Sequence, residues 1–189
     1  NYNEFYEKRW FASGFQLQAE HVMLCGQQVP MGRELLFESA DGVRFGVELY
    51  EDLWTALPPS TFLSLHGAEL IVNLSASNEL IAKREYRQEL VRQQSARCLC
   101  AYLYVSAGVG ESTSDLVFSG HSMVAQCGGM VKENADYLAE NYVLTADLDL
   151  DRIRGDRREQ TSFADAQTHY GTLEPVRRVS CPALMLAES

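Results

Sequence analysis

A long helical pattern between two apolar runs is the feature that most constrains the fold of this chain. Residues 76–99, ASNELIAKREYRQELVRQQSARCL, place apolar side chains near one helix face and charged side chains on the other. The runs ELIVNL (69–74) and AYLYVSA (101–107) on either side have the length and composition of β-strands. ELIVNL does not alternate, which predicts a strand covered on both faces. Strands that alternate with helices predict an α/β domain, or more broadly an α+β layered domain.

Paired extended runs predict hairpins before and after this unit. ELLFES (34–39) and VRFGVEL (43–49) flank Asp41-Gly42, and an Asp-Gly pair between apolar runs is a strong hairpin signal. The segment HSMVAQCGGMVKE (121–133) has the pattern of two strands around a Gly-Gly turn. The domain should therefore combine helix-connected strands with hairpins in the same layered architecture.

Other segments carry weaker patterns. Residues 16–25 predict a strand that ends in a turn near Gly26, and Pro58-Pro59-Ser60 predicts a helix start because proline fits a first helical turn. The alternating run at 142–150 predicts a last strand. From Asp151 onward the chain is charged and weakly apolar, which predicts a helical turn followed by an arm that packs elsewhere.

Composition excludes several classes of function. A formal net charge of −10 over 189 residues argues against a nucleic-acid partner, because phosphate binding needs a basic surface. No run of eighteen apolar residues is present, so no membrane-spanning segment is predicted. The opening NYNEFYEKRW lacks the pattern of a secretory signal, and the absence of an initiator Met leads us to expect a fragment.

The five cysteines are scattered and odd in number, which favours reduced thiols and a cytoplasmic location. Cys98 and Cys100 form a C-x-C pair, but no His or Cys pair at a matching spacing occurs elsewhere. Core packing is therefore the favoured interpretation of this pair, and no metal site is predicted.

Two polar segments follow predicted strands and are candidates for a site. Glu48, Glu51 and Asp52 cluster in FGVELYEDLW (45–54), either as a solvated acidic turn or as the rim of an active site. NLSASNELIAK (73–83) begins with polar side chains that either cap the helix or bind a ligand at the carboxyl edge of the sheet. The glycine-rich loop SAGVGEST (106–113) lacks the Gly-Lys-Ser/Thr ending of a Walker A loop and predicts a plain loop.

Blocks in register connect these segments to a known family. NYNEFYEKRWF, FGVELYEDLW, ELIVNLSASNE, YRQELVRQQSARC, AYLYVSAGVGESTSDLVFSGHSM and DLDLDRIRGDRREQTSF together resemble the amino-terminal glutaminase domain of glutamine-dependent NAD synthetases, within the nitrilase (carbon–nitrogen hydrolase) superfamily. The resemblance covers most of residues 1–165. It implies a nitrilase-type α-β-β-α sandwich, incomplete at the amino terminus. It also implies a partial glutaminase domain over 1–150 and an arm or linker over 151–189 toward an absent synthetase domain.

The resemblance implies hydrolysis of glutamine by a Glu–Lys–Cys triad. In the family the Cys attacks the side-chain amide, ammonia leaves, and water hydrolyses the thioester to glutamate, with Glu as general base and Lys beside the oxyanion. The ammonia passes to a carboxy-terminal synthetase domain that uses ATP and magnesium to form NAD. No cofactor is therefore expected in this chain itself.

Tyr50 occupies the position of the nucleophile in this resemblance. The family's turn reads Glu, aliphatic, Cys, Glu, Asp, Leu, Trp, and here it reads ELYEDLW at 48–54. The family's Lys and Glu fall before the first residue of the chain, so we expect no complete triad. A phenol with a pKa of ~10 is a poor nucleophile for an amide compared with a thiol near ~8.5. An inactive glutaminase is therefore expected, in which the backbone N–H of Glu51 keeps the position of an oxyanion donor.

Substrate-binding positions match the family better than the triad does. Tyr2 matches an aromatic residue of the glutamine pocket, and Ser77 matches a serine that contacts glutamine. Lys83 matches a basic residue that contacts glutamine, with lysine in place of arginine, which keeps the charge. The resemblance also implies a homo-oligomer. The alternative hypothesis is a non-catalytic nitrilase-like module for ligand binding or assembly, which the tyrosine at position 50 suggests.

Overall fold

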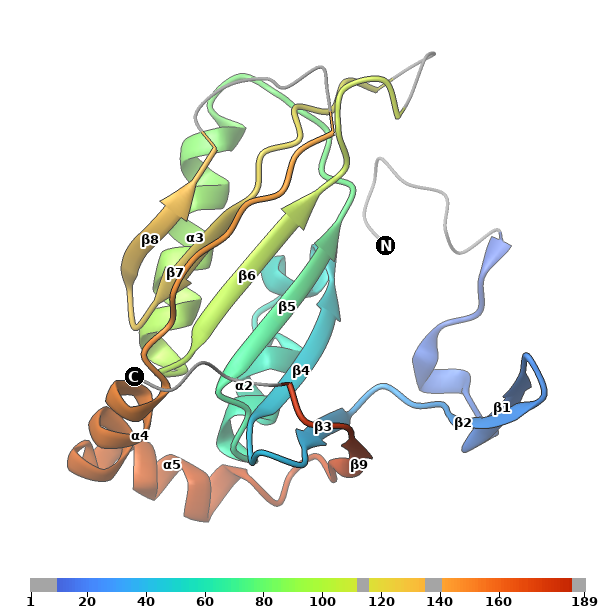
Figure 1. The fold of residues 1–189 in the computed structure, drawn as a ribbon, viewed down its shortest axis with the longest axis vertical. Helices are drawn as coiled ribbons and strands as arrows, with labels where there is room; N and C mark the ends of the chain where they lie inside the picture. Colours follow the sequence, from blue (N-terminus) through green and yellow to red (C-terminus); the bar gives the residue numbers. More distant parts are fainter. Residues whose placement is uncertain (1–9, 112–115, 135–140, 185–189) are drawn as a thin grey trace.

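A computed structural model describes residues 10–111, 116–134 and 141–184 as one seven-stranded sheet, its helices and a separate two-stranded hairpin (Figure 1). The strand order in the sheet is β8-β7-β6-β5-β4-β3-β9. In those ranges no helix has the length and apolar character needed to cross a bilayer. The elements are η1 (Gly14–Gln16), β1 (His21–Leu24), β2 (Gln27–Pro30), β3 (Leu35–Ser39), β4 (Arg44–Leu49), η2 (Tyr50–Trp54), α2 (Pro59–Leu65), β5 (Leu70–Ser75), α3 (Lys83–Arg97), β6 (Ala101–Ser106), β7 (Met123–Gln126), β8 (Gly129–Glu133), α4 (Leu150–Glu159), α5 (Thr161–Tyr170) and β9 (Arg177–Cys181).

Three parallel strands form the centre of the sheet. β4 pairs with β5 and β5 with β6, each pair in parallel and joined through a helix. β3 pairs antiparallel with β4 across the predicted hairpin, where Gly42 takes a φ of +82° that a residue with a Cβ rarely adopts. β7 and β8 form the second predicted hairpin beside β6. The layered α/β prediction is thus confirmed.

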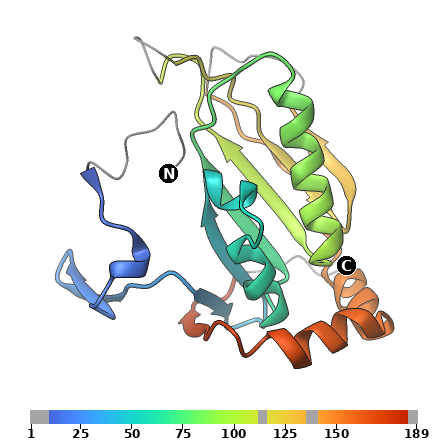
Figure 2. The same cartoon turned by 180° about the vertical axis from the view of Figure 1, so that it is seen from behind.

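Helices α2 and α3 cover one face of the sheet (Figure 2). Beneath them lies the core, in which Ile71, Tyr102 and Tyr104 are fully buried. The opposite face carries no helix over β4 and β5 (Figure 1), and Leu74 on that face is 52% exposed. The prediction that residues 69–74 are covered on both faces is therefore wrong for the described structure, because only one helix layer packs on the central strands.

The helix predicted over 76–99 begins later than its pattern indicated. α3 starts at Lys83, after Ala82 with a left-handed φ of +63°. The preceding loop is held by other partners, since the Glu79 N–H donates to the Val117 carbonyl at 2.7 Å. This long-range bond fixes the loop at a point where helix propensity alone would have extended the helix.

Two other strand predictions need correction. In the segment 16–25 only His21–Leu24 is a strand, and it turns at Gly26 into β2 as expected. The alternating run 142–150 forms no strand and leads into α4. The places on both sides of β7 are taken by β6 and β8, and the segment pairs with no strand of the sheet. Instead, the Gln126 side chain exchanges hydrogen bonds with the backbone of Asp149, at 2.9 and 3.1 Å.

The charged segment after residue 150 packs on the same sheet, whereas we had expected an arm that packs elsewhere. The Arg157 guanidinium donates to the carbonyls of Ala68, Cys98 and Leu99 at 2.6, 3.0 and 2.9 Å. Further along, β9 pairs in parallel with β3. Arg157 thus anchors α4 to the sheet. The boundary at 150 and a linker toward a further domain stay predictions.

Candidate active site

The candidate site lies where the three central strands end. In parallel register, Leu49 of β4 is opposite Leu74 of β5, and Ser75 is opposite Ser106 of β6. The short helix η2 follows β4 directly, and the loop with Ser77 and Asn78 follows β5. Both polar segments singled out in the sequence therefore meet at one edge of the sheet, the edge where ligands of α/β proteins bind.

The backbone at Tyr50 is held in an unusual conformation. Tyr50 has a φ of +33°, a left-handed value that is uncommon for a residue other than glycine. The Asp52 carboxylate accepts the Leu49 N–H at 2.8 Å and closes the turn around it. Burial raises the pKa of Asp52, its largest influence, while this hydrogen bond opposes the rise. Strained turns of this kind persist where the surrounding structure enforces them, often at functional sites.

Tyr50 and Lys83 come together across the site. The Lys83 Nζ donates to the Tyr50 hydroxyl at 3.3 Å and also donates to the Asn78 side-chain oxygen. The same Nζ lies 5.8 Å from the centre of the Tyr50 ring, while Trp54 packs edge-on against that ring with centroids 5.1 Å apart. The structure thus joins two of the predicted site residues, with the phenol in contact with the only lysine predicted to bind substrate.

Ser77, in contrast, is completely buried. Its hydroxyl accepts a hydrogen bond from Arg87 at 3.0 Å, and Arg87 also donates to the Glu79 carboxylate at 2.7 Å and to His121 Nδ1 at 3.1 Å. A guanidinium can only donate, so His121 Nδ1 carries no proton and its ring N–H is on Nε2. That nitrogen lies 2.8 Å from Glu133. Burial lowers the pKa of His121, in keeping with a neutral ring.

Sequence reasoning missed Arg87, although its spacing carried a signal. Arg87 is fully buried on α3, four residues before the buried Val91 and therefore on the same helix face. A charged residue in register with an apolar helix face is a candidate for a buried polar contact. Here it is the side chain that orders the loop after β5.

The acidic cluster separates into different environments. Glu48 is 2% exposed and points into the core, where its carboxylate accepts the Ser60 N–H at 2.8 Å and the Tyr102 hydroxyl hydrogen. Burial raises the pKa of Glu48, more than these hydrogen bonds lower it. Asp52 closes the turn, and Glu51 is half-buried in η2. The interpretation as a solvated acidic turn therefore fails for Glu48.

Asn73 connects this buried carboxylate to Tyr50. Its side-chain amide donates to the Tyr102 hydroxyl at 3.0 Å and to the Tyr50 carbonyl at 3.4 Å. Asn73 is fully buried in the middle of β5, ten residues before α3 begins, so capping does not explain it. Its side-chain oxygen is buried without a hydrogen-bond partner.

Some predicted features lie elsewhere or stay predictions. Tyr2 is outside the described residues, and the Glu51 N–H as an oxyanion donor stays a prediction. Cys98 and Cys100 are buried thiols in the core. Across residues 10–111, 116–134 and 141–184, no three His, Cys, Asp or Glu side chains gather as a metal site would require.

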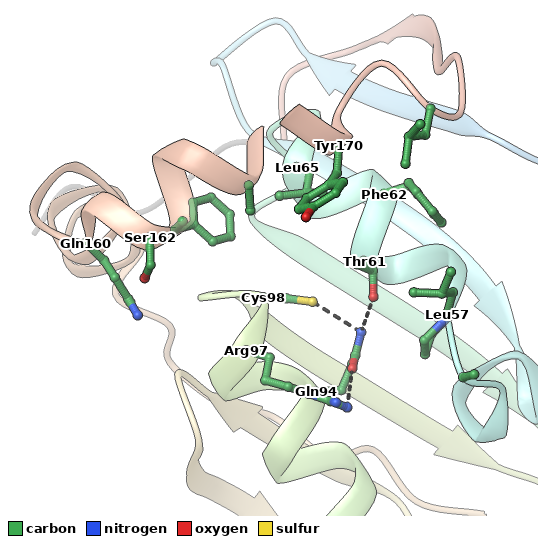
Figure 3. Close-up of a pocket in the computed structure, with 15 residues that line it drawn as sticks. Leu57, Thr61, Phe62, Leu65, Gln94, Arg97, Cys98, Gln160, Ser162 and Tyr170 are labelled. Atoms are coloured by element: carbon green, nitrogen blue, oxygen red, sulfur yellow. Dashed lines mark hydrogen bonds between the residues drawn. The ribbon is translucent and has the colours of Figure 1, made fainter. Parts of the chain in front are cut away.

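A hollow lies away from Tyr50, between α2, α3 and α5. This cavity of about 510 Å³ is lined mainly by apolar side chains, among them Leu57, Phe62 and Tyr170 (Figure 3). At one side the Gln94 amide donates to Thr61 at 3.1 Å and to Cys98 at 3.2 Å. Neither Ser77 nor Lys83 lines this cavity, nor does Tyr50, so among the described residues it is separate from the candidate site.

Comparison with known proteins identifies the family of this chain. The family model described as carbon-nitrogen hydrolase matches residues 5–158. The glutamine-dependent NAD(+) synthetase of Mycobacterium leprae is 37% identical over 183 residues, which cover 94% of this chain and 26% of that protein. The synthetase of the same name from Thermotoga maritima is 34% identical over 152 residues, 80% of this chain and 23% of the relative.

Solved structures give the same picture for the fold. A crystal structure of a glutamine-dependent NAD(+) synthetase from Cytophaga hutchinsonii aligns with a TM-score of 0.57 and 26% identity, over 69% of this chain and 20% of that one. A carbon-nitrogen hydrolase from Helicobacter pylori shares the fold, with a TM-score of 0.55 and 20% identity, over 71% of this chain and 50% of that one. The chain therefore spans about a quarter of the curated relatives it matches, and it belongs to the carbon–nitrogen hydrolase family.

Proposed function

We propose that this chain is the glutaminase portion of a glutamine-dependent NAD synthetase, and that Tyr50 makes it inactive as it stands. The observation that carries the proposal is the left-handed turn at Tyr50, at the carboxyl end of β4 and next to Lys83. The similarity to curated synthetases extends through this turn. In the parent reaction a thiol at this position would attack the glutamine amide and release ammonia.

The chemistry of the phenol supports inactivity. A phenol has an ordinary pKa of ~10, so at neutral pH it is a much poorer nucleophile for an amide than a thiolate is. The Tyr50 ring also occupies the space beside Lys83 and Trp54. Lys83, the proposed partner of the substrate carboxylate, is thereby engaged by the protein's own side chain.

The remaining predicted roles belong to the same proposal. Glutamine would contact Tyr2, Ser77 and Lys83, and the Glu51 N–H would stabilise the oxyanion. Since Ser77 is buried on Arg87, it would reach a ligand only after a rearrangement of the loop after β5. ATP and magnesium would act in a separate synthetase domain, and the assembly would be a cytoplasmic homo-oligomer.

Restoring the thiol tests this proposal. The complete protein with Tyr50→Cys should release ammonia from glutamine, whereas the natural protein and Tyr50→Ala should not. Tyr50→Ala is the matched control because it removes the ring without adding a nucleophile. Ammonia release by the natural protein, or none from the Tyr50→Cys variant in a folded state, would refute the proposal.

The alternative function is a non-catalytic binding or assembly module. The hydrogen bond between Lys83 and Tyr50 favours this alternative, because it holds the Tyr50 side chain in the position of the nucleophile, where the phenol does not react. Calorimetric titration with glutamine separates the two hypotheses. Saturable binding to the natural protein without ammonia release would favour the binding module.

A further inference from the structure

A chain of hydrogen bonds runs from the buried Glu48 to the turn at residue 50. The side chains that form it come from three neighbouring strands: Glu48 from β4, Asn73 opposite it on β5, and Tyr102 from β6. All three side chains are at most 2% exposed. We call these residues the Glu48 chain; its last link is the Asn73 amide, which donates to the Tyr50 carbonyl at 3.4 Å.

The NH2 group of Asn73 sets the direction of the bonds in the Glu48 chain. This group can only donate, so the Tyr102 hydroxyl accepts from it at 3.0 Å and donates its own hydrogen to the Glu48 carboxylate. The other carboxylate oxygen of Glu48 accepts the Ser60 N–H at 2.8 Å. Both oxygens thus accept, which is the pattern of an ionised carboxylate.

We propose that Glu48 is a positioning residue whose ionised carboxylate orients Tyr102 and Asn73 and so holds the carbonyl of residue 50 in the left-handed turn. This proposal rests on the proposed function for its catalytic consequence. A proton on Glu48 would have to be donated to Tyr102, whose hydrogen would then turn toward Asn73. Asn73 would have to rotate its amide, and its oxygen would face the Tyr50 carbonyl, so two acceptors would repel each other.

The unpartnered oxygen of Asn73 supports this direction. It is buried without a hydrogen-bond partner, a costly state, while the amide hydrogens are donated to Tyr102 and Tyr50.

The titratable groups that face Glu48 are Asp52 from η2, Tyr102 from β6 and Cys98 at the end of α3. Helix α2 and strand β5 contribute the neutral side chains of Ser60 and Asn73. Burial and the charge of Asp52 both raise the pKa of Glu48, so this carboxylate should take up a proton at a higher pH than an exposed glutamate does.

The test uses the complete protein that carries Tyr50→Cys, with Glu48→Gln added. A glutamine at 48 donates to Tyr102 and so imitates the protonated chain at every pH. We expect kcat to fall about tenfold or more with little change in KM, since a misplaced nucleophile loses orientation and not substrate affinity. In the Tyr50→Cys protein, protonation of Glu48 should lower kcat at acidic pH. Glu48→Gln should remove this pH dependence.

Matched variants separate positioning from simple damage. Glu69→Gln changes another buried carboxylate, which pairs with Arg154 at the opposite end of β5, and should leave kcat within about twofold. Tyr102→Phe breaks the chain without altering Glu48 and should lower kcat in the same way. If Glu48→Gln or Tyr102→Phe proteins that are folded by circular dichroism retain the kcat of Glu69→Gln, the positioning role is overturned while the proposed function stands.

An infrared measurement makes the inference independent of activity. The difference spectrum between the natural protein and Glu48→Gln should contain a carboxylate band at neutral pH, which is replaced by a carboxylic acid band on acidification. A carboxylic acid band at neutral pH would overturn the inference. Absence of ammonia release from Tyr50→Cys would refute the proposed function instead, so the two failures can be told apart.

Discussion

The two ends of the same sheet use buried polar groups in different ways. At the amino ends of the central strands, Arg154 pairs with Glu69 at 2.5 Å and Arg157 donates to three carbonyls. At the carboxyl ends, Glu48 is held by neutral donors, an oxygen of Asn73 has no partner, and Tyr50 has a positive φ. The first end satisfies its charges and anchors α4, whereas the second end retains costly features that stability alone does not explain.

The largest expected effect is at the anchoring end. Arg157→Ala should lower the free energy of unfolding by about 3 kcal/mol, because three buried carbonyls lose their donor. Denaturant titration of the complete protein measures it. Arg158→Ala, an exposed neighbour on α4, is the control and should change stability by less than about 0.5 kcal/mol. Equal effects of the two variants would show that Arg157 is no anchor.

A smaller effect should isolate the strain at position 50. In that left-handed conformation a Cβ costs about 1 kcal/mol, so Tyr50→Gly should be more stable than Tyr50→Ala by about that amount. Comparing these two variants cancels the loss of the ring against Trp54 and Lys83. Thermal unfolding of the pair provides the measurement, and a more stable alanine variant would argue against a left-handed turn.

The smallest change should come from Glu48→Gln, and its sign depends on pH. The folded-state pKa of Glu48 is raised above the value of about 4.5 in an unfolded chain, so the folded state binds this proton more tightly. The stability it contributes is present below the unfolded pKa and is lost as pH rises through the folded pKa. Glu48→Gln should therefore gain stability relative to the natural protein between pH 4 and pH 7. A constant difference across that range would contradict the assignment.

The two ends of the sheet should respond in opposite ways when a buried carboxylate is replaced by an amide. The same substitution that relieves the buried carboxylate at neutral pH should lower kcat in the Tyr50→Cys protein. A residue that costs stability while it orients a reacting group is the expected pattern of a functional site. At the anchoring end, Glu69→Gln should do the reverse, with stability lost and kcat retained.

Local patterns predicted much of this architecture. The Asp41-Gly42 turn, the strands of the central sheet and the turn at Gly26 follow from short-range chemistry and were found as expected. The start of α3 was wrong because Glu79 bonds to a carbonyl 38 residues away in the sequence, at Val117. The strand predicted over 142–150 is absent, because a strand forms only where it finds a pairing partner, and no local pattern reports which partner is available.

The contact between two of the predicted site residues followed from the family resemblance, whereas their surroundings did not. The resemblance assigned Tyr50 and Lys83 to one site, and the structure brings their side chains within 3.3 Å; their roles stay predictions. The burial of Ser77 on Arg87 and the Glu48 chain depend on contacts between separate strands and helices. Such contacts arise only when distant segments pack together, so spacing along the chain could not reveal them.

The central claim is that the turn at position 50 is a nucleophile's turn with its thiol replaced. A diazoketone analogue of glutamine, which alkylates a reactive thiol in a glutamine site, tests it most directly. Peptide mass mapping of the complete Tyr50→Cys protein should find the adduct on the introduced thiol, and excess glutamine should prevent it. An adduct distributed over the natural cysteines, or no protection by glutamine, would contradict the account.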